Sequence, residues 1–213
     1  MKERPILFSA PMVRAILSGR KTQTRREVKR CGLLESTGGQ GMRPIPIACP
    51  HGRPGDRLWV RETWQYAPVK YCDCPQGSEA QPCDDWIEGI GCRSNRTEVI
   101  YREDEATAAK WRSPIHMPRW ASRITLEITD IRVERLQEIS DADAMAEGAA
   151  FTCPQCGNDL DDEHGAEVHA ACDDPDMGSH GEGFRRIWTA INGSGSWDAN
   201  PWVWVIEFRG VDS

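Results

Sequence analysis

The sequence has no long apolar run, no apolar leader and no excess of positive charge. None of its stretches approaches the roughly 20 consecutive apolar residues that cross a bilayer. The start of the sequence, residues 1–5, lacks the apolar h-region of a signal peptide, so we expect a cytoplasmic protein. The net charge of −7 argues against an extended basic face for duplex DNA, although a small basic pocket is compatible with it.

The sequence also lacks an internal repeat and a regular alternation of strands with helices. Its apolar patterns predict strands at residues 6–8, 57–64, 99–101, 124–133 and 202–208. Helices are expected after Ser9, after Ser140 and around Phe184 to Ile191, ending near Gly19, Gly148 and Gly193. This order is typical of an α+β fold rather than a doubly wound sheet. The length suits one domain, residues 1–213, with Cys-rich insertions at 65–98 and 151–181.

Nine cysteines in a chain expected to be cytoplasmic are better explained by metal than by disulfides. The second insertion contains a C-x2-C pair followed by glycine, which is typical of half a zinc knuckle. It predicts a structural zinc on Cys153, Cys156, Cys172 and a histidine, either His164 or His169, of which we take His169. The first insertion predicts a second metal site with four thiolate ligands, Cys72, Cys74, Cys83 and Cys92. Cys49 or His51 could replace one of these four ligands. Unliganded, reduced cysteines are the alternative for both groups.

The densest cationic cluster, GRKTQTRR at residues 19–26, directly follows a short helical pattern. Gly19 is suited to end that helix. A basic turn in an acidic protein suggests a bound ligand, and a solvated run of charges is the alternative. Lys21 and Thr24 would lie on opposite faces of a regular strand, so a turn or bulge is needed to bring both into one pocket.

This segment resembles the basic motif of the ASCH domain family, which belongs to the PUA-like β-barrels. Three further segments resemble the family in order: PGDRLWVRETW at 54–64, residues 124–136 with the acidic helix after them, and WVWVIEF at 202–208. The chain is most similar to the longer ASCH proteins common in phages and prophages. The resemblance implies a PUA-like mixed β-barrel with flanking helices and two Cys-rich loop insertions.

One bacterial branch of the ASCH family hydrolyses N4-acetylcytidine to cytidine and acetate, with a lysine, a threonine and a glutamate as its proposed catalytic set. The resemblance assigns these roles to Lys21, Thr24 and Glu147, the last through the spacing of residues 136–147. Thr24 could act as nucleophile or position water, Lys21 could take its proton, and Glu147 could protonate the leaving amine. Without the resemblance, Glu147 would be interpreted as an exposed residue at a helix end.

Two further residues are candidates for substrate binding. Arg26 is expected as a structural or charge-stabilising group. Glu62 shares a predicted strand face with apolar residues, so it is either paired, for instance with an arginine, or functional. The known hydrolases are much shorter, and other ASCH proteins are reported or proposed to bind or cleave RNA. A non-catalytic reader of RNA or of a modified base, and a ribonuclease, therefore stay open as alternatives.

Residues 111–123 are expected to form an ordered loop that carries cations and two indoles. Arg112, His116 and Arg119 alternate there with Trp111 and Trp120. Such a loop could line a binding site, or its tryptophans could simply anchor it to the rest of the fold.

Overall fold

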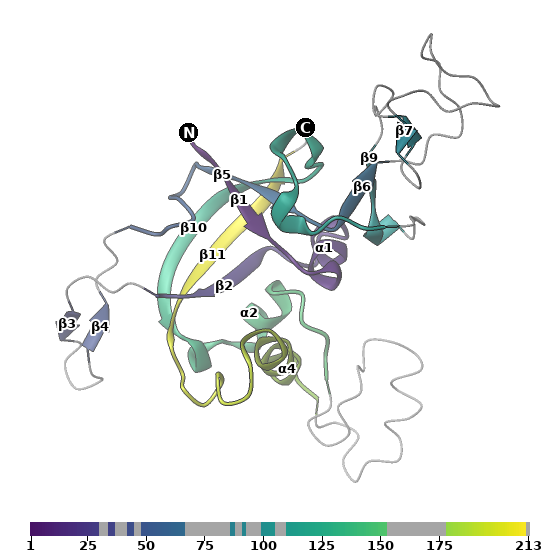
Figure 1. Cartoon of the computed structure of the whole chain (residues 1–213). Helices are drawn as coiled ribbons and strands as arrows, with labels where there is room; N and C mark the ends of the chain where they lie inside the picture. The colour runs from purple at the N-terminus through teal and green to yellow at the C-terminus, as the bar shows by residue number, and fades with distance from the viewer. Residues whose placement is uncertain are drawn as a thin grey trace, which may run out of the picture. The chain divides into compact units, whose positions relative to one another are not determined.

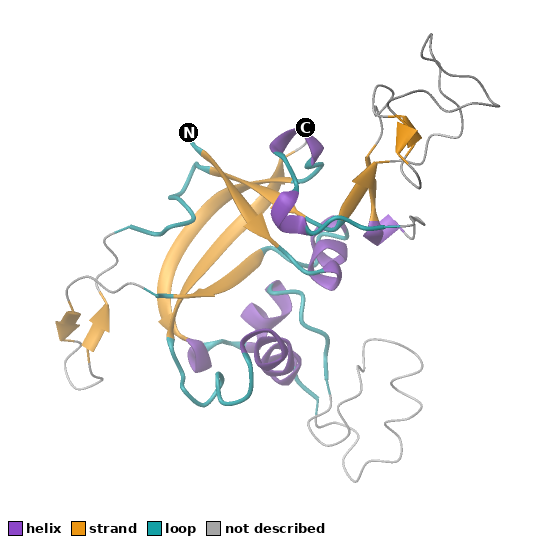
Figure 2. Cartoon of the chain, viewed as in Figure 1, coloured by secondary structure: helices purple, strands orange, loops and turns teal. Residues whose placement is uncertain are grey.

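The computed structural model describes residues 1–29, 34–36, 42–44, 48–66, 86–87, 91–92, 99–104, 110–152 and 178–211. Within these ranges the protein is a mixed α+β structure with more strand than helix (Figure 2). A five-stranded sheet has the order β1 (Glu3–Leu7), β5 (Arg57–Arg61), β10 (Thr125–Arg135), β11 (Trp202–Val211) and β2 (Gln23–Glu27). The α+β class is confirmed, and no closed barrel is found among these described strands.

The first two described α-helices begin after the predicted caps, and all described α-helices end near the predicted glycines, whereas the last one begins before Phe184, where its apolar pattern starts. α1 (Ala10–Leu17) is followed by Gly19, which has the left-handed φ of +74°. α2 (Asp141–Ala146) is capped by the Ser140 hydroxyl, which accepts a hydrogen bond from the Asp143 amide at 3.1 Å. α4 (His180–Asn192) is capped in the same way by Ser179 and ends at Gly193. Its first turn therefore falls inside the range expected to be insertion.

Three two-stranded sheets complete the described strands. β6 (Trp64–Tyr66) pairs antiparallel with β9 (Val99–Tyr101), so the predicted strand 57–64 is in fact two strands, and residues 65–66 of the range expected to be insertion lie in β6. β3 (Leu34–Ser36) pairs with β4 (Met42–Pro44), two strands that the apolar patterns did not predict. β7 (Trp86–Ile87) pairs with β8 (Gly91–Cys92) inside the first insertion. The structure describes only the backbone of these last two pairs.

The chain divides into two compact units. The first unit comprises Met1–Lys2, Ala15–Arg57 and Leu126–Gly210, and the second comprises Glu3–Arg14, Leu58–Thr125 and Val211–Ser213. In Figure 1, β10 and β11 of the first unit are long, bent strands that run side by side, and α2 lies beside α4. No helix in the described ranges is long and apolar enough to cross a membrane.

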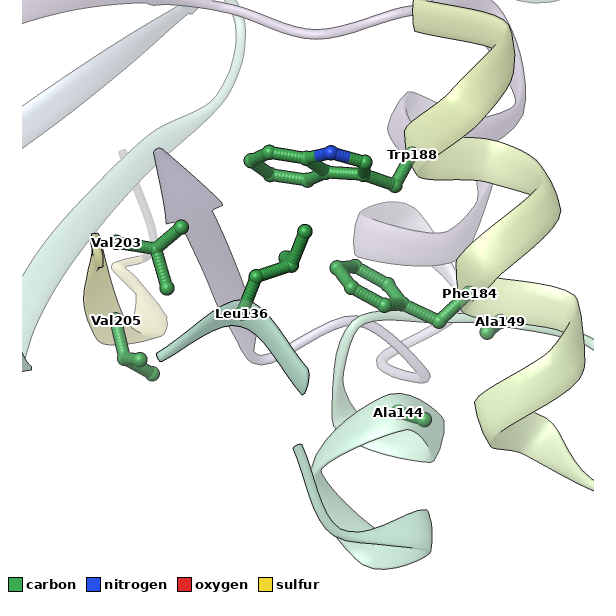
Figure 3. Close-up of a cluster of buried hydrophobic side chains, with 7 residues drawn as sticks. All are labelled: Leu136, Ala144, Ala149, Phe184, Trp188, Val203 and Val205. Carbon is green, nitrogen blue, oxygen red and sulfur yellow. The ribbon is translucent and has the colours of Figure 1, made fainter. Parts of the chain in front are cut away.

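The core of the first unit joins α4 to the sheet. Phe184 and Trp188 point from α4 toward Leu136, which follows β10, and Val203 and Val205 of β11 lie beyond it (Figure 3). All five side chains are buried. The apolar spacing of residues 184–191 predicted the buried face of α4. The burial of this face holds α4 against β11, the strand that pairs with β2.

The second unit has a smaller core around β6. Trp64 packs there with Met117 and Ala121, and all three are almost completely buried. Two 3-10 turns, Pro114–His116 and Arg119–Ala121, shape the loop that carries the last two residues. The loop is therefore ordered, as its composition predicted, and at least part of its role is to cover β6.

Candidate functional site

The basic segment 19–26 is fixed by backbone hydrogen bonds before its side chains are considered. The Lys21 amide donates to the Ala15 carbonyl of α1 at 2.9 Å, and the Thr22 amide donates to the Ala146 carbonyl of α2 at 2.8 Å. The Thr22 carbonyl accepts from the Phe208 amide of β11 at 2.9 Å. Strand β2 begins only at Gln23, so Lys21 lies in the expected turn.

The structure brings Lys21 into direct contact with Glu147. The Lys21 Nζ donates to the Glu147 Oε2 at 2.7 Å and to the Glu147 carbonyl at 2.8 Å. The exposed fractions of the two side chains are 0% and 3%, so the pair lies out of water. Glu147 caps the C-terminus of α2, and the interpretation of it as an exposed helix residue is wrong.

Gly148 makes this close approach possible. Its φ is +76°, a backbone conformation that residues other than glycine rarely adopt. A Cβ there would meet the Cβ of Ala15 at 2.9 Å and the Cβ of Lys21 at 3.2 Å. The glycine that ends α2 therefore also leaves room for the backbone of the basic turn.

Arg25 links the pair to two more carboxylates. Its side chain is completely buried, and its guanidinium nitrogens lie 3.3 Å from Glu147 Oε1, 3.2 Å from Glu134 Oε2 and 3.4 Å from Asp143 Oδ2. Its guanidinium also lies 5.8 Å from the centre of the Phe184 ring. We call Lys21, Arg25, Glu134, Asp143 and Glu147 the charge cluster.

Arg132 extends the charge cluster toward solvent. It pairs with Glu134 and Glu207, and its Nη2 lies 3.0 Å from Asp143 Oδ1. Burial would lower the pKa of Arg132, but the carboxylates outweigh it and raise that pKa. Burial would likewise raise the pKa of Asp143, but the Ser140 hydroxyl, Arg25 and Arg132 together lower it.

Lys21 behaves differently from these outer groups. Burial lowers the pKa of Lys21, and the attraction of Glu147 opposes this without reversing it. Arg26 and Arg25 add to the lowering, but burial is the larger cause. Burial also lowers the pKa of Arg26, again against the attraction of Glu147. The cluster therefore contains an amine whose neutral form is favoured relative to an amine in water.

Thr24 is also buried, on β2 opposite Ile206 of β11. The three residues that the resemblance proposed as catalytic thus all lie in the first unit, two of them in contact. Sequence reasoning missed Arg25 as a bridge between carboxylates, and it assigned Asp143 only to the N-terminus of a helix. The one feature of the sequence that could have indicated a role for Arg25 was its position next to Thr24 in the basic motif.

Glu62 belongs to the second unit and is paired there. Arg123 donates to both of its carboxylate oxygens at 3.0 Å and to Asp104 at 2.8 and 2.7 Å. The Arg123 guanidinium lies 3.9 Å from the centre of the Tyr101 ring. Burial would lower the pKa of Arg123, but Glu62 and Asp104 raise it. The expectation that Glu62 is paired is confirmed, and its role in substrate binding stays a prediction.

The predicted zinc ligands cannot be placed. Cys72, Cys74, Cys83, Cys153, Cys156, Cys172, His164 and His169 lie outside the described residues, and Cys92 lies in β8, where only the backbone is described. Across the ranges that are described, no three His, Cys, Asp or Glu side chains are grouped so as to hold a metal.

Comparison with known proteins adds one distant likeness. No family model matches the chain, and no curated protein matches it. A crystal structure of a protein from Enterococcus faecalis V583, described as family DUF984, is similar with a TM-score of 0.36 and 10% sequence identity. The similarity covers 100% of this chain and 82% of that chain. It is a distant fold relation and assigns neither family nor activity.

Proposed function

We propose that the chain is an ASCH protein with a PUA-like barrel, and that it hydrolyses the amide of an N4-acylated cytosine nucleoside such as N4-acetylcytidine. The observation that carries the proposal is the 2.7 Å contact between Lys21 Nζ and Glu147 Oε2. The motif resemblance selected these two residues from segments far apart in the sequence. Their contact in a dry interior is what a shared catalytic task would require.

The residues suit the chemistry of amide hydrolysis. A base must take a proton from the attacking oxygen, and an acid must deliver one to the departing amine. Lys21 with a lowered pKa suits the first step, because more of it is neutral than of an ordinary lysine. Glu147 accepts a hydrogen bond from the Lys21 amine, so a proton taken up by Lys21 can pass through Glu147 to the exocyclic nitrogen of the departing cytosine. Water is added across the C–N bond, giving cytidine and a carboxylic acid.

Thr24 acts in this scheme in one of two ways: as the nucleophile, forming an acyl ester that water then hydrolyses, or by positioning the water that attacks the carbonyl. Arg25 and Arg26 supply fixed positive charge in a region where water is largely excluded. Such charge stabilises the oxyanion of the tetrahedral intermediate more strongly than it would in water. Arg25 also holds the second oxygen of Glu147, which orients the other oxygen toward Lys21.

The test is the absorbance change of N4-acetylcytidine with purified protein and three variants. Lys21→Ala and Thr24→Ala are expected to abolish turnover. Arg20→Ala is the matched control, because Arg20 lies in the same motif but is exposed and bonds only locally to Ser18. No turnover by folded wild-type protein, or equal loss in all three variants, would overturn the proposal.

A non-catalytic reader of RNA or of a modified base is the second candidate. The observation in its favour is the concentration of cations in the basic segment 19–26, which a reader would use to hold RNA. A reader would bind RNA without turnover or strand scission, and its affinity would fall with salt. Strand scission would instead indicate a ribonuclease.

The proposal includes structural zinc in the Cys-rich insertions, first of all on Cys153, Cys156, Cys172 and His169. Cys72, Cys74, Cys83 and Cys92 are the second proposed set. Zinc is expected to hold these segments, which have few apolar residues, rather than to take part in the reaction, since four protein ligands close the metal. Elemental analysis should therefore find at least one zinc per chain, and a chelator should lower the melting temperature.

A further inference from the structure

An exposed aromatic array stands on the core of the second unit. Trp120 is 62% exposed, and its indole stacks on the Tyr66 ring with centroids 6.1 Å apart and planes 25° apart. Buried Trp64 meets both rings edge-on, at 6.1 Å from Trp120 and 5.4 Å from Tyr66. We call Trp64, Tyr66 and Trp120, together with Arg112, the aromatic platform.

The aromatic platform is held rigidly. Residue 112 bridges to β6, with the Arg112 amide donating to the Trp64 carbonyl at 2.9 Å. The Arg112 guanidinium lies 5.0 Å from the centre of the Tyr66 ring and 5.3 Å from that of Trp64. Its Nε donates to the neutral Gln65 side-chain oxygen at 3.1 Å, and Gln65 in turn donates to the Lys110 carbonyl. A planar, exposed ring thus rests on a fixed support.

The charge around the platform is positive, in a chain whose net charge is −7. Residues 110–123 contain four Lys or Arg and no Asp or Glu. Arg119 and Arg123 are paired with Glu3, Glu62 and Asp104. Among the described residues, no carboxylate pairs with Lys110 or Arg112. The Arg112 guanidinium lies beside the Tyr66 and Trp64 rings, and Lys110 precedes it by two residues, with its carbonyl bonded to the Gln65 side chain.

We propose that the aromatic platform binds single-stranded nucleic acid, with an unpaired base stacked on Trp120 and the adjacent phosphates near Lys110 and Arg112. An indole face accepts any base, and an adjacent guanidinium suits an anionic backbone. A cationic ligand is disfavoured because Arg112 already lies over the rings. The platform belongs wholly to the second unit, so this inference does not rest on the proposed hydrolysis by the first.

The experiment is fluorescence anisotropy with labelled oligouridine RNA of about ten nucleotides, a length within the range that such sites cover. Trp120→Ala should weaken binding about 5- to 150-fold, the range that corresponds to losing one stacked base. Trp120→Phe should retain most of the affinity because it keeps a flat ring. Ile115→Ala is the matched control, because Ile115 is an exposed apolar side chain of the same loop without a π-face.

Two further measurements distinguish binding of a single strand from binding of a duplex or of a peptide. Lys110→Gln should reduce the slope of log affinity against log salt concentration by about one, as expected for the loss of one phosphate contact. Oligothymidine DNA should behave like the RNA, and a duplex of the same length should bind more weakly, because its bases are not free to stack. Affinity that is equal in wild-type protein and Trp120→Ala, or binding of a proline-rich peptide with no binding of the RNA, would overturn the proposal. Because Trp120 lies outside the charge cluster, hydrolysis of free N4-acetylcytidine should be unchanged in Trp120→Ala.

Discussion

Replacing Glu147 by glutamine is the sharpest test of the charge cluster, because it removes one charge and almost no volume. The carboxylate holds Lys21 Nζ at 2.7 Å through one oxygen and Arg25 Nη1 at 3.3 Å through the other. Glutamine can still accept a hydrogen bond from Nζ, and the bond from Nζ to the carbonyl of residue 147 is unaffected. What is lost is the negative charge between two buried cations.

The cost can be worked out from these contacts. Removing one partner of a buried ion pair costs about 3–5 kcal/mol, since the remaining charge is left without compensation. Arg25 retains Glu134 and Asp143, and the hydrogen bond to Lys21 persists, so we expect Glu147→Gln to fall near the lower limit. For a domain of this size, a loss of about 3 kcal/mol lowers the melting temperature by roughly 6–12 °C.

Urea unfolding followed by tryptophan fluorescence measures this loss directly. Glu127→Gln is the matched control: Glu127 pairs with Arg209 at 3.0 Å, but that arginine is 68% exposed. Such a surface pair contributes about 0–1 kcal/mol, so the control should unfold almost like wild-type protein. If Glu147→Gln also lay within about 1 kcal/mol of wild type, the Lys21–Glu147 pair would not be the buried contact described here.

Replacing both partners completes the test. In the double variant Lys21→Met/Glu147→Leu no unpaired lysine is left, and apolar replacements of buried ion pairs are often neutral or stabilising. We therefore expect it to be more stable than Glu147→Gln alone and yet inactive toward N4-acetylcytidine. A double variant that is less stable than the sum of its single changes would mean that the pair is required for folding rather than for chemistry.

Three further predictions follow from the same region. The pKa of Lys21 is lower in the folded chain than its ordinary value of 10.5, so at pH values between the two the unfolded chain binds a proton that the folded chain has released. The free energy of unfolding, measured with urea, should therefore rise with pH in this window, and Lys21→Met should remove the rise. Gly148→Ala should destabilise more than Gly19→Ala in thermal melts: both glycines have a positive φ, but only at Gly148 would the new Cβ meet neighbouring atoms. Ser140→Ala should cost about 1 kcal/mol in the same melts through the lost helix cap, with a small effect on turnover.

The elements that the sequence predicted well are those whose causes are local. The cap at Ser140 and the glycine at 148 lie within a few residues of the helix they bound, and β10 follows the alternation of Leu126 and Ile128. The β3–β4 hairpin was missed because Gly and Pro dominate the composition around it. The division of the predicted strand 57–64 was missed because the partner of β6, β9, lies more than 30 residues further along the chain.

The charge cluster shows what local patterns cannot predict. Helical periodicity places Glu147 at the end of α2 and says nothing of the turn before β2 that covers it. Only the resemblance selected Glu147, and no pattern indicated that Arg25 would reach three carboxylates from α2 and β10. Burial of a charge is decided by contacts between distant segments, so it is read from a structure more readily than from a sequence.

The Lys21–Glu147 pair and the ion pairs of Arg123 differ in the direction of their pKa shifts. In the second unit, Glu62 and Asp104 raise the pKa of Arg123, so that arginine stays charged and links the 3-10 turn Arg102–Asp104 to Glu62. In the first unit, burial outweighs Glu147 and lowers the pKa of Lys21. A lysine kept only to fasten two elements would gain from a retained charge, whereas a general base must release its proton near working pH. The direction of the Lys21 shift is compatible with the role of general base that we propose for it, and the ion pairs of Arg123 suit a structural role.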